Sequence, residues 1–123
     1  MSQVINSKIE KLSKSKFRSS FHLRKKEIEY IDKLGIEEIK KQAYEIINKR
    51  IKPEIIENDG KQTPMKNHPV FIGQHATATC CRNCLYKWHH IKKNKELTDH
   101  EIDFVVELIM EWIRRQYERN KMS

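Results

Sequence analysis

The sequence predicts an all-α protein, a single small domain of about four helices with one long irregular loop near residues 53–73. Three observations support this prediction. The chain has 123 residues, a usual length for one domain. Apolar residues recur every three or four positions in several segments, which is the spacing of one helix face. Charged residues make up 34% of the chain and apolar residues 37%, as in amphipathic helices whose outer faces meet water.

The beginning of the chain is strongly basic. Residues 1–19 are expected to form an arm, either a frayed helix or disordered, ahead of a helical domain at residues 20–121. The first 26 residues hold eight basic side chains and one acidic one, so they carry most of the net charge of +8. Such a segment suits an acidic partner, most commonly DNA or RNA, although a solvated tail is the alternative. The candidate nucleic-acid contacts are Lys14, Lys16, Arg18, Arg24, Lys25 and Lys26.

Two helices joined by a tight turn are expected next. The spacing of Ile28, Ile31 and Leu34 predicts the first, within residues 23–34. Gly35 favours its end, because glycine accepts the left-handed conformation found at helix C-termini. An apolar stripe at helical spacing predicts the second over residues 36–51, and the following proline would stop it. A helical hairpin of this kind occurs in DNA-binding modules and also in ordinary bundles.

Residues 53–73 have no sustained period and contain several turn signals, among them Asp59-Gly60 and Thr63-Pro64. An irregular segment of this length is usually functional or disordered. Its polar side chains could hold an anion such as phosphate, although it lacks the order of a Walker loop and a plain surface loop is the alternative. The candidate anion-binding residues are Lys61, Gln62, Thr63, Lys66 and Arg82.

The last helix has the strongest pattern in the chain. Thr98 and Glu101 have the spacing of a capping box, which predicts a helix start at Asp99. Apolar residues then recur to about Glu118 in a band that is wider than packing against one neighbouring helix would need. We therefore expect this helix to be central and packed on more than one side.

No apolar run approaches the roughly 20 residues needed to cross a bilayer, and the N-terminus lacks the apolar core of a secretory signal. We therefore expect a soluble cytoplasmic protein with no membrane partner. The chain has three cysteines, two of them adjacent, which is no disulfide framework. In a reducing compartment such a cluster is metal-binding, catalytic or simply buried.

Residues 68–90 hold all three cysteines and four of the six histidines. If residues 74–90 were one helix, the three thiols would share a face with Trp88 and could simply be buried in the hydrophobic core. Alternatively, Cys81-x2-Cys84 has the spacing of a zinc knuckle, and zinc needs four nitrogen or sulfur ligands. The candidate ligands are Cys80, Cys81, Cys84, His68, His75 and His89.

A third interpretation of the same residues is catalytic. A cysteine paired with His75 or His68 could act as a thiolate nucleophile, and a helix N-terminus would lower its pKa. A bound metal could instead activate water. The sequence leaves open whether the protein is an enzyme.

The run DGKQTPMKNHPVFIGQHATATCCRNCLYKWHHI resembles the signature of a family of small prokaryotic proteins known only as a domain of unknown function. The resemblance extends from about Phe17 (FRSSFHL) to about Trp112 (LIMEWI). His90 stands where the family pattern implies glycine. The resemblance supports a single domain and implies no activity, but it marks these positions as candidates: Gly60, Lys61, Gln62, Thr63, Pro64, His68, His75, Cys80, Cys81, Arg82, Cys84, Trp88 and His89.

The sequence therefore favours a zinc-stabilised module that binds nucleic acid. The two alternatives are an enzyme that uses the His/Cys site and a structural or interaction protein whose cysteines are core.

Overall fold

A computed structural model describes residues 1–122, and over that range the protein is all-helical, as predicted. The elements are α1 (Ser2–Ser13), the 3-10 helix η1 (Arg18–Ser20), α2 (Lys25–Leu34), α3 (Ile36–Arg50), α4 (Pro69–Ala76), α5 (Arg82–His89) and α6 (Asp99–Met122). These residues thus form six α-helices, so the prediction of about four was too low. Among them we find no helix with the length and apolar character needed to cross a membrane.

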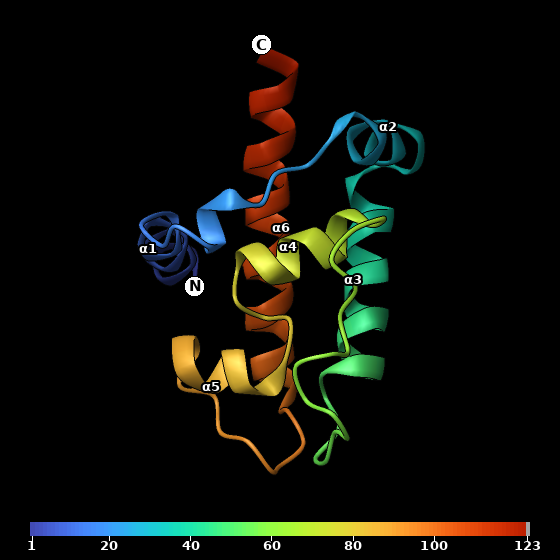
Figure 1. Ribbon diagram of the computed structural model, residues 1–123. Coiled ribbons are helices and arrows are strands. Elements are labelled where there is room, and N and C mark those ends of the chain that lie inside the picture. The colour runs from blue at the N-terminus through green and yellow to red at the C-terminus, as the bar shows by residue number, and fades with distance from the viewer. Residues whose placement is uncertain (123) are drawn as a thin grey trace.

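Helix α6 is the central column of the fold, with α1 on one side and α3 on the other (Figure 1). Its start is the predicted capping box: Glu101 N donates to Thr98 Oγ1 at 3.1 Å, and Thr98 N donates to Glu101 Oε1 at 2.9 Å. The wide apolar band is buried because α1, α3 and α4 all pack against this helix. The predicted central helix is therefore confirmed, and it ends at Met122 rather than near Glu118.

The predicted helical hairpin is formed by α2 and α3. Gly35 joins them with φ of 87°, a conformation that favours glycine. Helix α3 ends at Arg50, three residues before Pro53. Its buried stripe packs into the main core against α6, so the hairpin covers one side of the central helix.

The N-terminal segment forms helix α1, where the sequence suggested a frayed helix or a disordered arm. The buried side chains of Ile5, Ile9 and Leu12 share one helix face. Ile5 and Ile9 form a small separate core cluster with Leu108 of α6. Lys11 is exposed on the outer face of this amphipathic helix, whereas Lys8 is half-buried and donates from Nζ to Trp88 O of α5 at 3.5 Å.

Residues 74–90 do not form one helix, and this break contributes to the higher helix count. Helix α4 ends at Ala76, and α5 starts only at Arg82. In between, Thr77 Oγ1 donates to Gly73 O at 2.7 Å, and Thr79 N donates to Gln74 O at 2.8 Å. Threonine side chains that bond to nearby backbone in this way compete with a helix. The chain therefore turns sharply before the cysteines.

The irregular loop also ends earlier than predicted. Pro69 is the first residue of α4, and His68 caps it by accepting from Val70 N at 3.0 Å through Nδ1. Proline is favoured at this position because the first helical N–H has no partner within the helix. Residues 70–72 thus belong to the first turn of a helix that packs on α6.

Candidate metal centre

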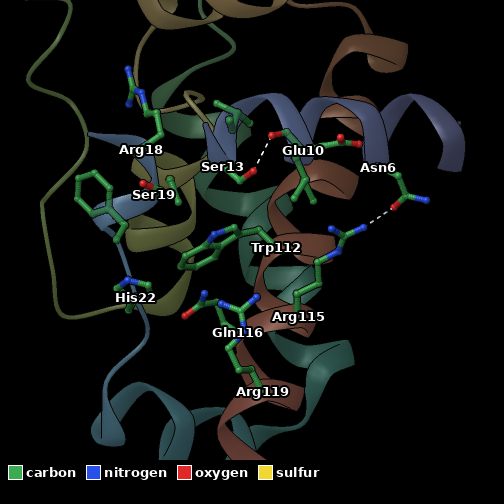
Figure 2. A pocket seen from close by; sticks show the side chains of 14 residues that line it. Asn6, Glu10, Ser13, Arg18, Ser19, His22, Trp112, Arg115, Gln116 and Arg119 are labelled. Carbon is green, nitrogen blue, oxygen red and sulfur yellow. Dashed lines mark hydrogen bonds between the residues drawn. The ribbon is translucent and has the colours of Figure 1, made fainter. Parts of the chain in front are cut away.

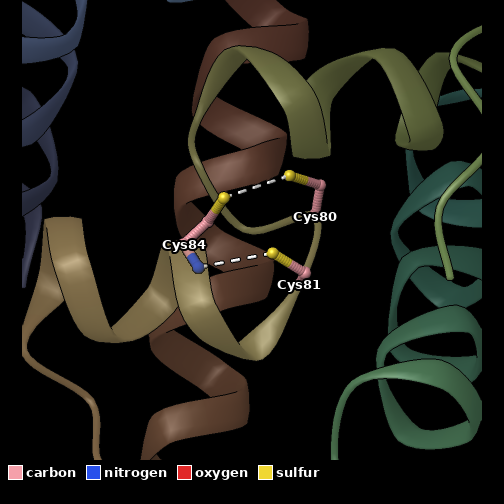
Figure 3. A group of neighbouring side chains, drawn as sticks. All are labelled: Cys80, Cys81 and Cys84. Atoms are coloured by element: carbon pink, nitrogen blue, oxygen red, sulfur yellow. Dashed lines mark hydrogen bonds between the residues drawn. The ribbon is translucent and has the colours of Figure 1, made fainter. Parts of the chain in front are cut away.

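Three thiols meet at the turn between α4 and α5. The Sγ atoms of Cys80, Cys81 and Cys84 all lie within 4.8 Å of one another, and Cys80 Sγ is 3.7 Å from Cys84 Sγ. Figure 3 shows Cys84 on α5 facing Cys80 and Cys81 on the preceding loop. Cys80 and Cys81 are buried and Cys84 is half-buried. Within residues 1–122 this is the one group of three or more metal-type donors.

The start of helix α5 holds these sulfur atoms in place. Cys81 is the N-cap of α5, and its Sγ accepts a hydrogen bond from Cys84 N at 3.3 Å. Cys84 lies in the first turn of the same helix. A helix N-terminus carries partial positive charge, which favours the thiolate over the thiol. The backbone therefore both gathers the sulfurs and stabilises negative charge on them.

Arg18 supplies a full positive charge to the cluster from η1. Its Nη2 donates to Cys84 Sγ at 3.3 Å, and its Nη1 contacts Cys80 Sγ at 3.8 Å and donates to His75 O at 2.8 Å. The side chain is only 8% exposed, and it forms no ion pair with a carboxylate among the described residues. Burying a cation costs free energy unless a negative group compensates it. For Arg18, the compensating groups are the Sγ atoms of Cys84 and Cys80.

The thiols differ in acidity. Hydrogen bonds from the Cys80 and Cys81 thiols, and then from Arg18, lower the pKa of Cys84 far below its usual value. The pKa of Cys80 is raised, because its thiol serves its neighbours as a donor and is buried. Both shifts act in one direction: they favour the thiolate at Cys84 over the thiolate at Cys80.

The sulfur spacing suits a single ion. Tetrahedral Zn–S bonds of about 2.3 Å place sulfur ligands about 3.8 Å apart, close to the 3.7 Å between Cys80 and Cys84. Three thiolates around a divalent ion would carry one net negative charge, opposite in sign to the guanidinium of Arg18. Three protein ligands also leave one position of a tetrahedron for a further ligand.

The structure places His68 away from this group. Its Nδ1 caps α4, and its Nε2 lies 2.8 Å from Gln42 Oε1 on α3. Both ring nitrogens therefore have protein partners, and the ring braces α4 against α3.

His75 and His89 also serve the backbone. His75 Nε2 donates to the carbonyls of Thr63 and Pro64, each at 3.1 Å, and so fastens the long loop to α4. His89 Nε2 donates to Thr77 O at 2.8 Å and holds α5 to the turn after α4. Of the six ligands that the sequence suggested, the structure brings together the three cysteines and none of the histidines.

Arg82 is also committed to the backbone. Its guanidinium is buried and donates to five carbonyls, those of Ile51, Lys52, Pro53, Lys92 and Lys95. These carbonyls come from two loops far apart in sequence. Arg82 therefore joins both loops to α5 and leaves little donor capacity for an anion.

The other loop candidates lie in two environments. Thr63 Oγ1 donates to Cys80 O at 2.6 Å, which ties the loop to the thiol turn. Gln62 bonds within the loop, to Asp59 and to Gly60 N. Lys61 and Lys66 are exposed.

Among the basic residues that the sequence assigned to nucleic acid, Arg18 is the exception. It lies in the thiol site, and the other five are exposed: Lys14, Lys16, Arg24, Lys25 and Lys26. Sequence reasoning therefore missed the role of Arg18. The signal was its place in FRSSFHL, the first motif of the family resemblance.

The fold and the site define a small all-helical protein with a three-cysteine cluster suited to a metal ion. The chain belongs to a family described as a domain of unknown function, DUF4186, whose family model matches residues 6–114. The resemblance to an uncharacterised domain family is thus confirmed, and the match reaches into α1. No solved structure matches the chain.

Proposed function

We propose that the protein is a zinc protein in which Cys80, Cys81 and Cys84 are the ligands. The observation that carries the proposal is the buried Arg18 bonded to a cluster of three sulfurs, without a carboxylate partner among the described residues. A purely apolar thiol core would have no use for a buried guanidinium. A zinc–thiolate centre needs such a charge, because its three thiolates outweigh the ion.

The ion would join the turn after α4 to the first turn of α5. Cys80 also carries the long loop through its carbonyl, which accepts from Thr63 Oγ1 at 2.6 Å. A metal at this point would therefore stabilise three segments at once. The fourth position of the zinc is open to water or to a ligand from outside the cluster.

The test is the metal content of untagged protein purified without chelator, followed by titration of the metal-free protein against a competing chromophoric chelator. We expect one zinc ion per chain. Cys80→Ser, Cys81→Ser and Cys84→Ser should each weaken binding by more than about 100-fold, and Arg18→Gln by about 10- to 100-fold as an outer partner of the sulfurs. Substitution with Co2+ should produce thiolate-to-metal charge-transfer absorption.

His75→Gln and His89→Gln are the matched controls, because the sequence suggested these histidines as ligands and the structure does not bring them into the cluster. Both variants should keep one zinc per chain, with helicity checked by circular dichroism. A native chain that takes up no zinc and whose thiols are protected would contradict the proposal and favour a structural core. If the protein contains no zinc and takes up none, rapid alkylation of Cys84 alone would instead favour a thiol nucleophile.

We also propose that the basic N-terminal region of this zinc protein contacts DNA or RNA. The observation in favour is that five of its six candidate side chains are exposed. Lys14 and Lys16 follow α1, Arg24 is the N-cap of α2, and Lys25 and Lys26 begin that helix, so these residues flank η1 on both sides. Phosphate contacts by such residues would dominate the affinity and make it depend on salt.

A further inference from the structure

A cavity of about 550 Å³ lies between α1, the segment around η1 and the second half of α6. Figure 2 shows Trp112 in its centre, with Arg115, Gln116 and Arg119 extending from α6 below it and α1 crossing above. The volume falls within the roughly 300–1,000 Å³ of small-molecule sites. Nothing in the zinc proposal requires this cavity, although Arg18 is among the residues that line it.

Three arginines and one acidic residue, Glu10, line the cavity. The guanidinium of Arg18 is used at the thiols, whereas Arg115 is held by Glu111 and by Asn6 Oδ1 at 2.7 Å. The exposed side chain of Arg119 has no hydrogen bond or ion pair with any of residues 1–122. One guanidinium at the cavity is therefore free to bind an anion.

The two arginines are well placed to act together. Arg115 and Arg119 are four residues apart on α6, so they lie one above the other on the same face. The hydrogen bonds of Arg115 to Glu111 and Asn6 fix its guanidinium beside the unpartnered guanidinium of Arg119. Paired guanidinium forks match the oxygen geometry of phosphate, and their hydrogen bonds are charge-assisted. His22 lines the cavity from the η1 side and is exposed.

The remaining wall is apolar. Ile9 and Leu12 of α1 and the ring of Trp112 line the cavity beside the arginines. A half-buried indole offers a flat surface on which an aromatic or planar group can stack. The cavity thus joins a site for an anionic group to a site for a planar one.

We propose that this cavity binds a small organic phosphate of about mononucleotide size. Arg119 and Arg115 hold the phosphate, and Trp112 packs against the planar part of the ligand. Glu10 accepts a hydrogen bond from a donor group on the planar part of the ligand. The site is distinct from the thiol cluster, and Arg18 is the residue that both share.

The test is a titration of the protein as purified, without added zinc, with adenosine 5′-monophosphate as the probe, followed by calorimetry and by the NMR shift of the Trp112 indole N–H. Adenosine and inorganic phosphate are the two partial probes. We expect the monophosphate to bind at least 10-fold more tightly than adenosine. Arg119→Gln should weaken its binding by about 10- to 100-fold, the usual effect of losing a charge-assisted hydrogen bond.

Lys41→Gln is the matched control. Lys41 is exposed on α3 and does not line the cavity, so its loss removes the same charge elsewhere. The control should bind the probe as the wild type does. The proposal is overturned if neither the monophosphate nor phosphate binds at about 1 mM, or if Arg119→Gln and Lys41→Gln weaken binding equally. Neither result would affect the zinc stoichiometry.

Discussion

A buried guanidinium needs a negative counterpart, and Arg18 finds it in sulfur rather than in a carboxylate. The sequence places Arg18 in a basic segment, and nothing in the sequence distinguishes it from its neighbours, which are all expected to be exposed. Only the fold distinguishes it, because η1 turns this one arginine inward to contact Cys84, 66 positions away. The local sequence pattern around Arg18 cannot indicate a contact with a residue so far away in the chain. The cysteines themselves were predictable as candidate ligands.

His90 is a position where the resemblance and the structure agree. The family pattern implies glycine there, and His90 adopts φ of 57° at the C-cap of α5. That left-handed conformation is the reason for glycine at helix ends. The histidine therefore adopts it at some conformational cost, and we expect His90→Gly to be neutral or stabilising.

The buried ring of His89 makes stability depend on pH. Burial lowers its pKa to about 4 from an ordinary 6.5. Because the folded-state pKa is depressed, the stabilisation is present above pH 6.5, where both states are neutral, and is lost as the pH falls from 6.5 towards 4, where only the unfolded chain takes up the proton. We expect a loss of about 3 kcal/mol across that window.

Urea denaturation with chelator present measures this effect without the metal. His89→Gln keeps a donor for Thr77 O but cannot titrate, so its unfolding free energy should fall much less between pH 6.5 and 4. His100→Gln, an exposed position in the first turn of α6, is the control and should behave as the wild type. Identical pH profiles for His89→Gln and wild type would contradict the assignment.

At the scale of elements, regular helices were the predictable part. The α2–α3 hairpin and α6 follow from apolar stripes, one glycine and one capping box, all of which act within a few residues. The break between α4 and α5 was not predictable in this way, because apolar and small residues continue through it. The break depends on Thr77, Thr79 and the cap at Cys81, whose hydrogen bonds form only in the folded turn.

Arg82 determines the position of α5, and its replacement should be strongly destabilising. Arg82→Leu would leave the carbonyls of two loops without their donor, at about 1–3 kcal/mol for each buried group. We therefore expect the unfolding free energy to fall by about 3 kcal/mol or more in urea denaturation. Arg82→Lys should recover only part of the loss, because a lysine cannot reach both loops with a planar fork.

Lys87→Gln is the control for Arg82, since Lys87 is exposed on the same helix. It should change the unfolding free energy by less than about 0.5 kcal/mol. If Arg82→Leu were equally mild, the two loops would have to be held by other contacts.

At the scale of the molecule, helix α1 brings the basic end of the chain close to both proposed sites. Lys8 Nζ reaches Trp88 O on α5 at 3.5 Å, and Arg18 follows the helix into the thiol cluster. The sequence separates a basic arm from a helical domain, whereas the structure packs α1 on α6. The apolar residues of α1 are too few to predict that packing, because it depends on a surface of α6 that only the assembled fold presents.

The uneven distribution of charge leads to the last prediction. Most of the net charge of +8 lies in the first 26 residues, so nucleic acid should bind there through phosphate contacts. We expect binding to a short single-stranded oligonucleotide in low salt, with an affinity that falls linearly on a plot of log K against log salt. The double variant Lys14→Gln/Lys16→Gln should reduce the slope by about 1.4, as two lost contacts to a single strand require.

The control must remove the same charge elsewhere, because total charge alone also affects binding. Lys41→Gln/Lys49→Gln does so on the exposed face of α3. If the basic N-terminal region makes the contacts, this second variant keeps the wild-type slope, and fluorescence anisotropy at several salt concentrations separates the two. Equal slopes for the two double variants would mean that the oligonucleotide is attracted only by the net positive charge of the protein. No binding at the lowest salt would remove nucleic acid as a partner and leave the exposed lysines as the solvated face of α1 and α2.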